Sequence, residues 1–312
     1  MTIQATHPTV PTRAVAPTRR RSRRARRRRW LGLLYLSPAL LLYAAIVLAP
    51  LAQTMNFSLY KWDGVSEPSW VGLRNYLNFG RDPRMLEAFG HVLVLIVMFG
   101  LVPLCLGLIC ASLLSRAKIR GEGIYRWFLF LPQVLTSVVV AIIWKRIYAP
   151  DGPLNTFLRS IGLDGMTRNW LGDFDWALPS LGMIGVWGGF GFTMVLFLAG
   201  VLAIPDEHYE AARLDGASRW QEFRYITLPG LRGQMAIALT LTIIGALRTF
   251  DMVYITTQGG PGTATTTPAL LLYQMAFVNP DVGVASATGV VLAFLCLGIA
   301  VGITRVMESK DR

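Results

Sequence analysis

The chain has 312 residues, of which 53% are hydrophobic and only 15% are charged, with a mean hydropathy of +0.46. A soluble domain of this length normally carries about a quarter charged residues. The composition therefore excludes an ordinary soluble protein and predicts a polytopic membrane protein. The formal net charge of +12 could indicate a nucleic-acid partner, but the positions of the basic residues argue against that class.

The most basic part of the chain comes first. Nine arginines stand among the eleven residues from Arg19 to Arg29, directly before an apolar run that begins at Trp30. An arm for nucleic acid or anionic lipid would have this composition, and so would a disordered cytoplasmic tail that fixes helix orientation. We interpret residues 1–29 as such a tail and expect no nucleic-acid partner. The apolar run that follows is too long for a signal peptide, so we expect an uncleaved anchor.

Six apolar runs are long enough to cross a membrane, which takes about 20 residues of helix. The fifth run is the weakest, because Arg248 and Asp251 fall within it. The three cysteines lie inside these runs without the spacing of metal ligands or redox pairs, so we interpret them as buried apolar residues. In chain order the runs are Leu31–Ala52, His91–Ser115, Trp127–Trp144 with an extension to Tyr148, Ala177–Ile204, Gly233–Tyr254 and Val282–Thr304.

The distribution of lysine and arginine predicts the orientation of these runs. With a cytoplasmic N-terminus, the inside segments carry 21 basic residues and the outside segments carry six, while the other three lie in or at the ends of helices. This asymmetry is the one that the positive-inside rule describes. We therefore expect an all-α membrane protein with six transmembrane helices and both termini in the cytoplasm.

A charged segment separates the fourth and fifth runs, and by this topology it is cytoplasmic. Its sequence from Ile204 to Gly230 is IPDEHYEAARLDGASRWQEFRYITLPG. Asp206 can cap a first helix that ends near Leu214, and Ser218 with Gln221 forms the S-x-x-Q pattern of a capping box at the start of a second helix. The residues alone leave two interpretations open: docking into a groove of a partner, or an amphipathic loop on the lipid headgroups.

The same segment resembles the coupling segment of ABC-importer permeases, whose pattern is E-A-A, three residues, G, nine residues and I-x-L-P. Longer stretches, such as WVGLRNYLNF, FLPQVLTSVVVAIIWKRIYAPDGPLN and TFDMVYITTQGGPGTATTTPALLLYQMAF, resemble the carbohydrate-uptake branch of maltose and glycerol-3-phosphate type permeases. The resemblance runs from Trp30 to Met307 and favours the first permease of the pair. Every element of the pattern is present at its spacing, in Glu210, Ala211, Ala212, Gly216, Ile226, Leu228 and Pro229, with Asp215 before the glycine.

The resemblance implies a division of labour among several chains. This chain and a second homologous permease would form one carbohydrate pathway through the lipid of a bacterial or archaeal cytoplasmic membrane. Each would insert its coupling helix into a homodimer of ATP-binding subunits, with Glu210 in contact with the ATPase, Ala211 and Ala212 in its groove, and Gly216 at the bend. An extracytoplasmic sugar-binding protein would deliver the substrate. ATP and Mg²⁺ would bind to the ATPase, because this chain has no G-x-x-x-x-G-K-[ST] loop, and we expect it to bind no cofactor itself.

The fourth run offers a candidate wall for the sugar pathway. Its stretch GVWGGFGFTM, residues 185–194, combines glycines that open space with aromatic faces that suit sugar rings. Close packing of helices through small residues would have the same composition. In the resemblance, Gly185, Gly188, Gly189 and Phe192 match family contact positions, and Trp187 supplies a further aromatic face.

The fifth run offers Gly245, Ala246 and Thr249, which match family contact positions in the same way. Arg248 and Asp251 are three residues apart, so on a continuous helix they would share a face and pair. Such a pair can extend to the outer interface, or it can be a polar site for substrate hydroxyls or for a phosphate on Arg248.

No catalytic or metal-binding constellation can be assembled from the remaining residues. The three histidines are scattered along the chain, and no nucleophile or paired carboxylate stands beside them in a recognisable pattern. We therefore expect no catalytic residue and no metal site. Asp251 is the best candidate for the alternative of a membrane-embedded enzyme.

These observations predict the permease subunit of a binding-protein-dependent ABC importer for a sugar. The predicted organisation is a tail at 1–29, a permease domain at 30–307 that contains the coupling segment 205–230, and a C-terminal tail at 308–312. One alternative is the same architecture for glycerol-3-phosphate or a polyol. Another, from a different class, is a stand-alone channel or secondary carrier.

Overall fold

The structure is a computed structural model that describes residues 34–114 and 122–308. The chain divides into two compact units, residues 1–53 and 54–312. In the first unit the described residues are helical from residue 34 onward, with a π-helical turn η1 at Ala44–Leu48. The predicted arginine-rich tail lies outside the described residues, as does most of the predicted C-terminal tail.

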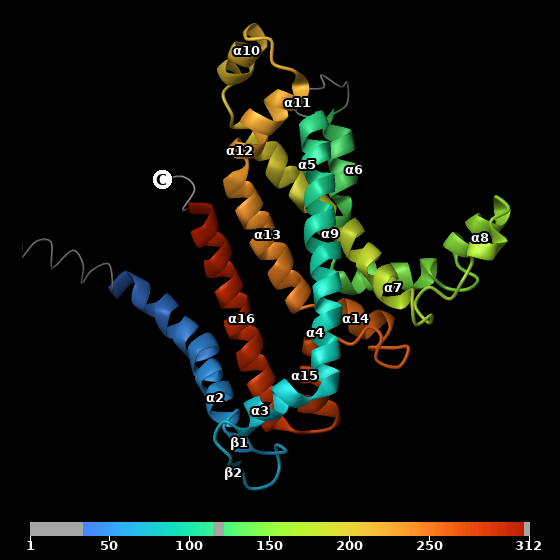
Figure 1. Ribbon diagram of the computed structural model, residues 1–312. Helices are drawn as coiled ribbons and strands as arrows, with labels where there is room; N and C mark the ends of the chain where they lie inside the picture. The colour runs from blue at the N-terminus through green and yellow to red at the C-terminus, as the bar shows by residue number, and fades with distance from the viewer. Residues whose placement is uncertain (1–33, 115–121, 309–312) are drawn as a thin grey trace, which may run out of the picture. The chain divides into compact units, whose positions relative to one another are not determined.

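The described part of the second unit is almost entirely helical, with one two-stranded hairpin (Figure 1). In Figure 1, α10 to α12 lie at one end of this unit, and β1, β2 and α3 lie at the other. The elements are α2 (Ala49–Phe57), β1 (Tyr60–Lys61), β2 (Ser69–Trp70), α3 (Arg74–Arg81), α4 (Pro83–Ile96), η2 (Val97–Leu101), α5 (Val102–Leu114), α6 (Glu122–Val134), α7 (Ser137–Ile147), α8 (Pro153–Ser160), η3 (Asp164–Met166), α9 (Ala177–Leu202), α10 (Asp206–Leu214), α11 (Arg219–Glu222), η4 (Phe223–Thr227), α12 (Leu228–Gly230), α13 (Arg232–Leu247), α14 (Asp251–Thr256), α15 (Pro268–Tyr273), η5 (Gln274–Val278) and α16 (Val282–Glu308).

Among the described residues, four helices are long and apolar enough to cross a membrane, and two bent pairs bring the number to six if each pair is one crossing. This confirms a mostly helical membrane protein. The fourth and sixth helices begin at the predicted residues, Ala177 and Val282. The second begins at Pro83 rather than His91, because Asp82 caps it by accepting a hydrogen bond from a backbone N–H of its first turn.

The third predicted crossing, Trp127–Trp144, is wrong as a single helix. The helices α6 and α7 meet at a bend of 98°. Pro132 lies inside α6, where it lacks the backbone N–H that a continuing helix needs. Thr136 then caps α7, its Oγ1 accepting from the N–H of Val139 at 3.5 Å. The bend therefore has a local cause, a proline followed by a capping threonine.

The fifth predicted crossing, Gly233–Tyr254, is also broken. Helix α13 ends at Leu247, and α14 begins four residues later. In the break, the carbonyl oxygen of Thr249 accepts a hydrogen bond from Thr267 Oγ1 at 2.9 Å. The segment between α14 and α15 therefore folds back and satisfies a backbone group that the broken helix leaves available.

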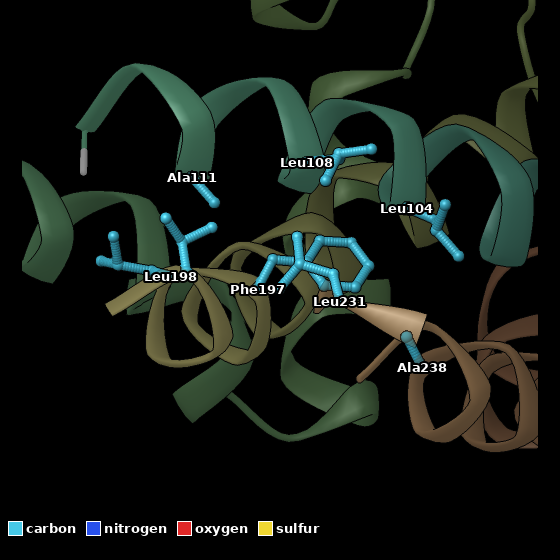
Figure 2. Packing of buried hydrophobic residues seen from close by; sticks show 8 residues of the cluster. Leu104, Leu108, Ala111, Phe197, Leu198, Leu231 and Ala238 are labelled. Atoms are coloured by element: carbon cyan, nitrogen blue, oxygen red, sulfur yellow. The ribbon is translucent and has the colours of Figure 1, made fainter. Parts of the chain in front are cut away.

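The main core of the unit lies where α5 packs along α9 (Figure 2). A glycine, Gly107, allows the two backbones to approach, because a Cβ there would overlap Thr193 and lie 2.7 Å from the backbone nitrogen of Met194. Thr193 is fully buried, and its Oγ1 donates to the carbonyl of Pro103 at 2.7 Å. The buried apolar side chains around this contact are Leu104, Leu108, Ala111, Phe197, Leu198, Val201, Leu231 and Ala238.

Replacing Gly107 by leucine is expected to destabilise the protein by about 1–3 kcal/mol, the usual cost of overpacking a tight contact. The change forces α5 away from the backbone of α9. Thermal unfolding of the detergent-purified chain measures the effect. The matched control is Gly90→Leu, since a Cβ at Gly90 meets nothing within 4 Å. Equal melting temperatures for the two variants would contradict the packing described here.

Candidate functional site

Segment 205–230 connects α9 to α13 and consists of two helical pieces held against each other. The first piece is α10, and the second is the run of α11, η4 and α12. Tyr209 of α10 is buried, and its hydroxyl lies 3.0 Å from Thr227 Oγ1 of η4. Arg213 Nε donates to Glu222 Oε1 at 3.1 Å, and Glu222 is also buried. These two contacts fix α10 against the second piece, so the segment is a folded unit rather than a loose loop.

The spacing from Ala212 to Gly216 has a clear structural cause. The N–H of Ala217 donates to the carbonyl of Ala212 at 2.9 Å, and the N–H of Gly216 donates to the carbonyl of Arg213 at 3.1 Å. This pair of bonds is a Schellman motif, which requires a left-handed residue after the helix. Gly216 supplies it with φ of +77°, a conformation that a side chain would strain.

The second piece begins with the predicted capping box. Ser218 Oγ accepts from the N–H of Gln221 at 3.3 Å, and Gln221 Oε1 accepts from the N–H of Ser218 at 2.7 Å. The predicted cap of the first helix is wrong: Pro205 occupies the N-cap position, and Asp206 is the first helical residue. Its carboxylate still lies in the first turn, where it complements the helix dipole.

The predicted coupling residues divide into an exposed face and a supporting set. Glu210, Ala211, Asp215 and Gly216 are exposed. Beside them lies Leu214, which is 89% exposed and which the sequence patterns did not single out. The signal that could have revealed it is a leucine placed between two charged residues, Arg213 and Asp215. The half-buried supporting residues are Ala212, Ile226, Leu228 and Pro229.

A cavity of about 460 Å³ lies between the helices, and its volume is within the usual range for a small-molecule site. Six of the predicted pathway residues line it: Gly185, Gly188, Gly189, Phe192, Gly245 and Thr249. The other lining residues are Phe99, Pro132, Gln133, Leu135, Ser137, Val140, Leu241, Thr242 and Met252. We call this space the glycine-lined cavity.

The glycines of α9 and α13 serve two different purposes. A Cβ at Gly185 would overlap the ring of Phe99, and one at Gly191 would overlap the backbone of α6 at Leu129. These two glycines permit close packing. At Gly188 and Gly245, by contrast, an added Cβ would meet nothing within 4 Å. These positions border open space in the cavity.

The polar groups of the cavity are uncharged. Thr242 Oγ1 donates to the carbonyl of Ala238 at 2.8 Å, and Thr249 Oγ1, in the break after α13, donates to the carbonyl of Gly245 at 2.9 Å. Both hydroxyls keep lone pairs available to accept further hydrogen bonds. Gln133 is exposed and its amide makes no hydrogen bond to the described residues, so it can both donate and accept. Of the described residues that line the cavity, none is charged. Such a site can bind hydroxyl groups on an uncharged ligand.

Four predicted pathway residues do not line the cavity. Trp187 packs against Trp144, with ring centroids 5.6 Å apart, and Ala246 is fully buried in the core. The predicted pair of Arg248 with Asp251 is wrong, although the structure describes both residues. Arg248 follows the end of α13, and the Asp251 carboxylate instead accepts from Ser137 Oγ at 2.9 Å.

Gln133 and Ser137 are cavity residues that the sequence patterns missed. Both lie at the α6–α7 bend. The signal that could have revealed them is Pro132 followed by Thr136, which together predict an interrupted helix. Within the described residues, no group of three His, Cys, Asp or Glu side chains could hold a metal ion.

Comparison with known proteins identifies similar chains. The profile of the family described as "Binding-protein-dependent transport system inner membrane component" matches residues 104–309. The chain is 36% identical over 270 residues to the probable ABC transporter permease protein YurN of Bacillus subtilis, covering 86% of this chain and 92% of that protein. It is 35% identical over 280 residues to the diacetylchitobiose uptake system permease protein NgcF of Streptomyces coelicolor, covering 86% and 79%.

A solved structure has the same fold. It is the crystal structure of a bacterial ABC transporter involved in the import of the acidic polysaccharide alginate. One of its chains superposes on this one with a TM-score of 0.80 at 22% identity, over 94% of this chain and 100% of that chain. At this level of identity the likeness concerns the fold alone.

Proposed function

Since this chain belongs to the family of binding-protein-dependent transport system inner membrane components, we propose that it forms half of a sugar pathway and couples it to an ATPase through segment 205–230. Membership makes the chain the permease subunit of an ABC importer, a multi-pass transport subunit of the inner membrane. The finer proposal concerns its substrate, its partners and the residues that serve them.

One observation carries the proposal: segment 205–230 joins the same two helices whose glycines open the cavity. Helix α9 contributes Gly188 to the cavity wall, and α13 contributes Gly245. A displacement of the segment would therefore move both helices that line the cavity. This connection suits a subunit in which ATP binding elsewhere changes access to a substrate site.

An uncharged glycoside is the substrate class that fits the cavity best. Its wall offers hydroxyl and amide groups for sugar hydroxyls, and Phe192 offers an aromatic face for the ring. Arg248, the candidate anchor for a phosphate, does not line the cavity. This disfavours glycerol-3-phosphate. The similarity to a diacetylchitobiose permease also supports a neutral sugar.

The proposed partners are a second homologous permease, a homodimer of ATP-binding subunits and an extracytoplasmic sugar-binding protein. The exposed face of α10, with Glu210, Ala211 and Leu214, would contact the ATPase. ATP and Mg²⁺ would bind to the ATP-binding subunits and not to this chain. Both termini and segment 205–230 would be cytoplasmic, as the positive-inside asymmetry predicts. A stand-alone channel or secondary carrier would not require a cytoplasmic segment that is held together by buried contacts such as Tyr209–Thr227 and Arg213–Glu222.

Co-purification tests the proposal. The tagged chain, extracted from native membranes in mild detergent, is expected to bring a second six-span permease and an ATP-binding subunit. Ala211→Arg, at an exposed position of α10, is expected to lose the ATP-binding subunit and retain the permease. Gly123→Arg on α6, where a Cβ would meet nothing within 4 Å, is the matched control. Recovery of the chain alone, or as a homo-oligomer, would refute the importer assembly.

A further inference from the structure

Helix α3 is held in one orientation by a buried side chain. Asn75 is 3% exposed, and its Nδ2 donates to the carbonyls of Ser58 and Tyr60, both at 2.8 Å. The hydroxyl of Tyr76 lies 2.7 Å from Ser58 Oγ. These bonds tie one face of α3 to the segment that leads from the end of α2 into β1. The opposite face is consequently fixed as well, and it points away from the protein.

That outward face combines large apolar side chains with arginines. Trp70 is 62% exposed, Leu73 67% and Leu77 60%. Arg74 and Arg81 are exposed beside them, and neither has a carboxylate partner among the described residues. In water this arrangement would leave three large apolar side chains unburied: Trp70 on β2, Leu73 directly before α3, and Leu77 on α3 itself. At a membrane surface, the apolar side chains can enter the acyl-chain region and the arginines can contact the lipid headgroups.

The neighbours of α3 set its depth in the membrane. It is followed directly by α4, the start of a crossing helix, and it packs against α16, another crossing helix. The backbone of α16 also approaches the hairpin: the N–H of Gly283 donates to the carbonyl of Trp62, directly after β1, at 3.2 Å. The helix therefore lies beside the first turns of two helices that are long and apolar enough to cross a membrane (Figure 1).

We propose that α3 is an interfacial helix that binds anionic phospholipid at this end of the protein. Trp70, Leu73 and Leu77 enter the upper acyl-chain region, and Arg74 and Arg81 contact lipid phosphates. Charge complementarity selects the lipid, because both arginines lack a protein partner in the described part and phosphate is the abundant anion at this depth. The inference depends on the membrane location alone and would survive a change of transported solute.

Fluorescence quenching of a label on α3 tests its depth. The full chain, purified with its co-purifying subunits, carries L77C on a background in which the three native cysteines are alanine. It is labelled with bimane and placed in nanodiscs of phosphatidylglycerol and phosphatidylethanolamine. The control label is at V65C, because Val65 is 94% exposed at the tip of the hairpin. Brominated lipid is expected to quench the L77C label roughly twice as strongly as the V65C label, and aqueous iodide is expected to do the reverse.

Two outcomes of this measurement would overturn the proposal. Equal iodide quenching of both labels would place α3 in water. Shielding of the L77C label from iodide and from brominated lipid would mean that a protein covers this face.

The choice of lipid is tested separately with the arginines. The double variant Arg74→Gln/Arg81→Gln is expected to retain roughly half as much phosphatidylglycerol, relative to phosphatidylethanolamine, in native mass spectra of the purified complex. Lys61→Gln, an exposed basic residue in the nearby hairpin, is the control and is expected to retain the original ratio. An unchanged ratio in the double variant would refute anionic-lipid binding by these residues.

Discussion

Replacing Gly188 by leucine is expected to lower sugar uptake on the order of 10- to 100-fold while the transporter remains folded and assembled. The new side chain enters open space, because a Cβ at Gly188 meets nothing within 4 Å and the residue borders the glycine-lined cavity. It therefore competes with substrate rather than with neighbouring helices. The measurements are uptake of radiolabelled sugar and recovery of the assembled complex.

Two variants with the same substitution separate blockage from misfolding. Gly185→Leu drives a side chain into the Phe99 ring, so its uptake should fall together with its melting temperature. Gly298→Leu also points into open space, but it lies on α16 away from the cavity, and it should transport normally. Normal uptake in Gly188→Leu would remove the cavity from the pathway. A parallel loss of uptake and stability there would show that the packing around Gly188 is tighter than described.

Replacing Glu210 by arginine is expected to uncouple the transporter, with sugar uptake and binding-protein-stimulated ATP hydrolysis both reduced about tenfold or more. Glu210 lies on the exposed face of α10, so the reversal leaves the internal contacts of segment 205–230 intact. Reversing a charge at a complementary interface costs several kcal/mol, and about 1.4 kcal/mol already corresponds to a factor of ten. Membrane insertion should be unchanged.

A charge reversal elsewhere in the segment is the control for Glu210. Arg224 is exposed on η4 and occupies one of the nine unspecified positions between Gly216 and Ile226. Arg224→Glu should therefore keep most of the coupled activity. Wild-type uptake and ATPase stimulation in Glu210→Arg would show that this face of α10 does not contact the ATPase. Equal losses in both variants would indicate a general effect of charge on the segment.

The features that could be predicted from sequence have local causes. Gly216 follows its helix at the position that needs a left-handed residue, and Ser218 with Gln221 forms a complete capping box within four residues. The ends of α9 were predictable because an uninterrupted apolar run stands between Trp176 and Pro205. In each case the residues that determine the structure are neighbours in the chain.

The features that were missed depend on residues far apart in the chain. The break after Leu247 is supported by Thr267, and Asp251 bonds to Ser137 rather than to Arg248. The glycines of α9 look alike in the sequence. The atoms opposite each glycine decide whether an added side chain would clash with a neighbouring helix or enter open space. A sequence pattern cannot assign these partners, because it contains no information on which helix lies opposite.

The absence of charge among the described residues of the cavity wall has a consequence for the energetics of transport. Voltage across a membrane does work only on charge that moves through the field, at about 2.3 kcal/mol per elementary charge for each 100 mV. Side chains such as Gln133, Thr242 and Thr249 carry no net charge. When these walls change orientation around a neutral solute, the potential neither drives nor opposes their motion. Under the proposed function, the free energy for that movement comes from ATP on the partner subunits rather than from the membrane potential.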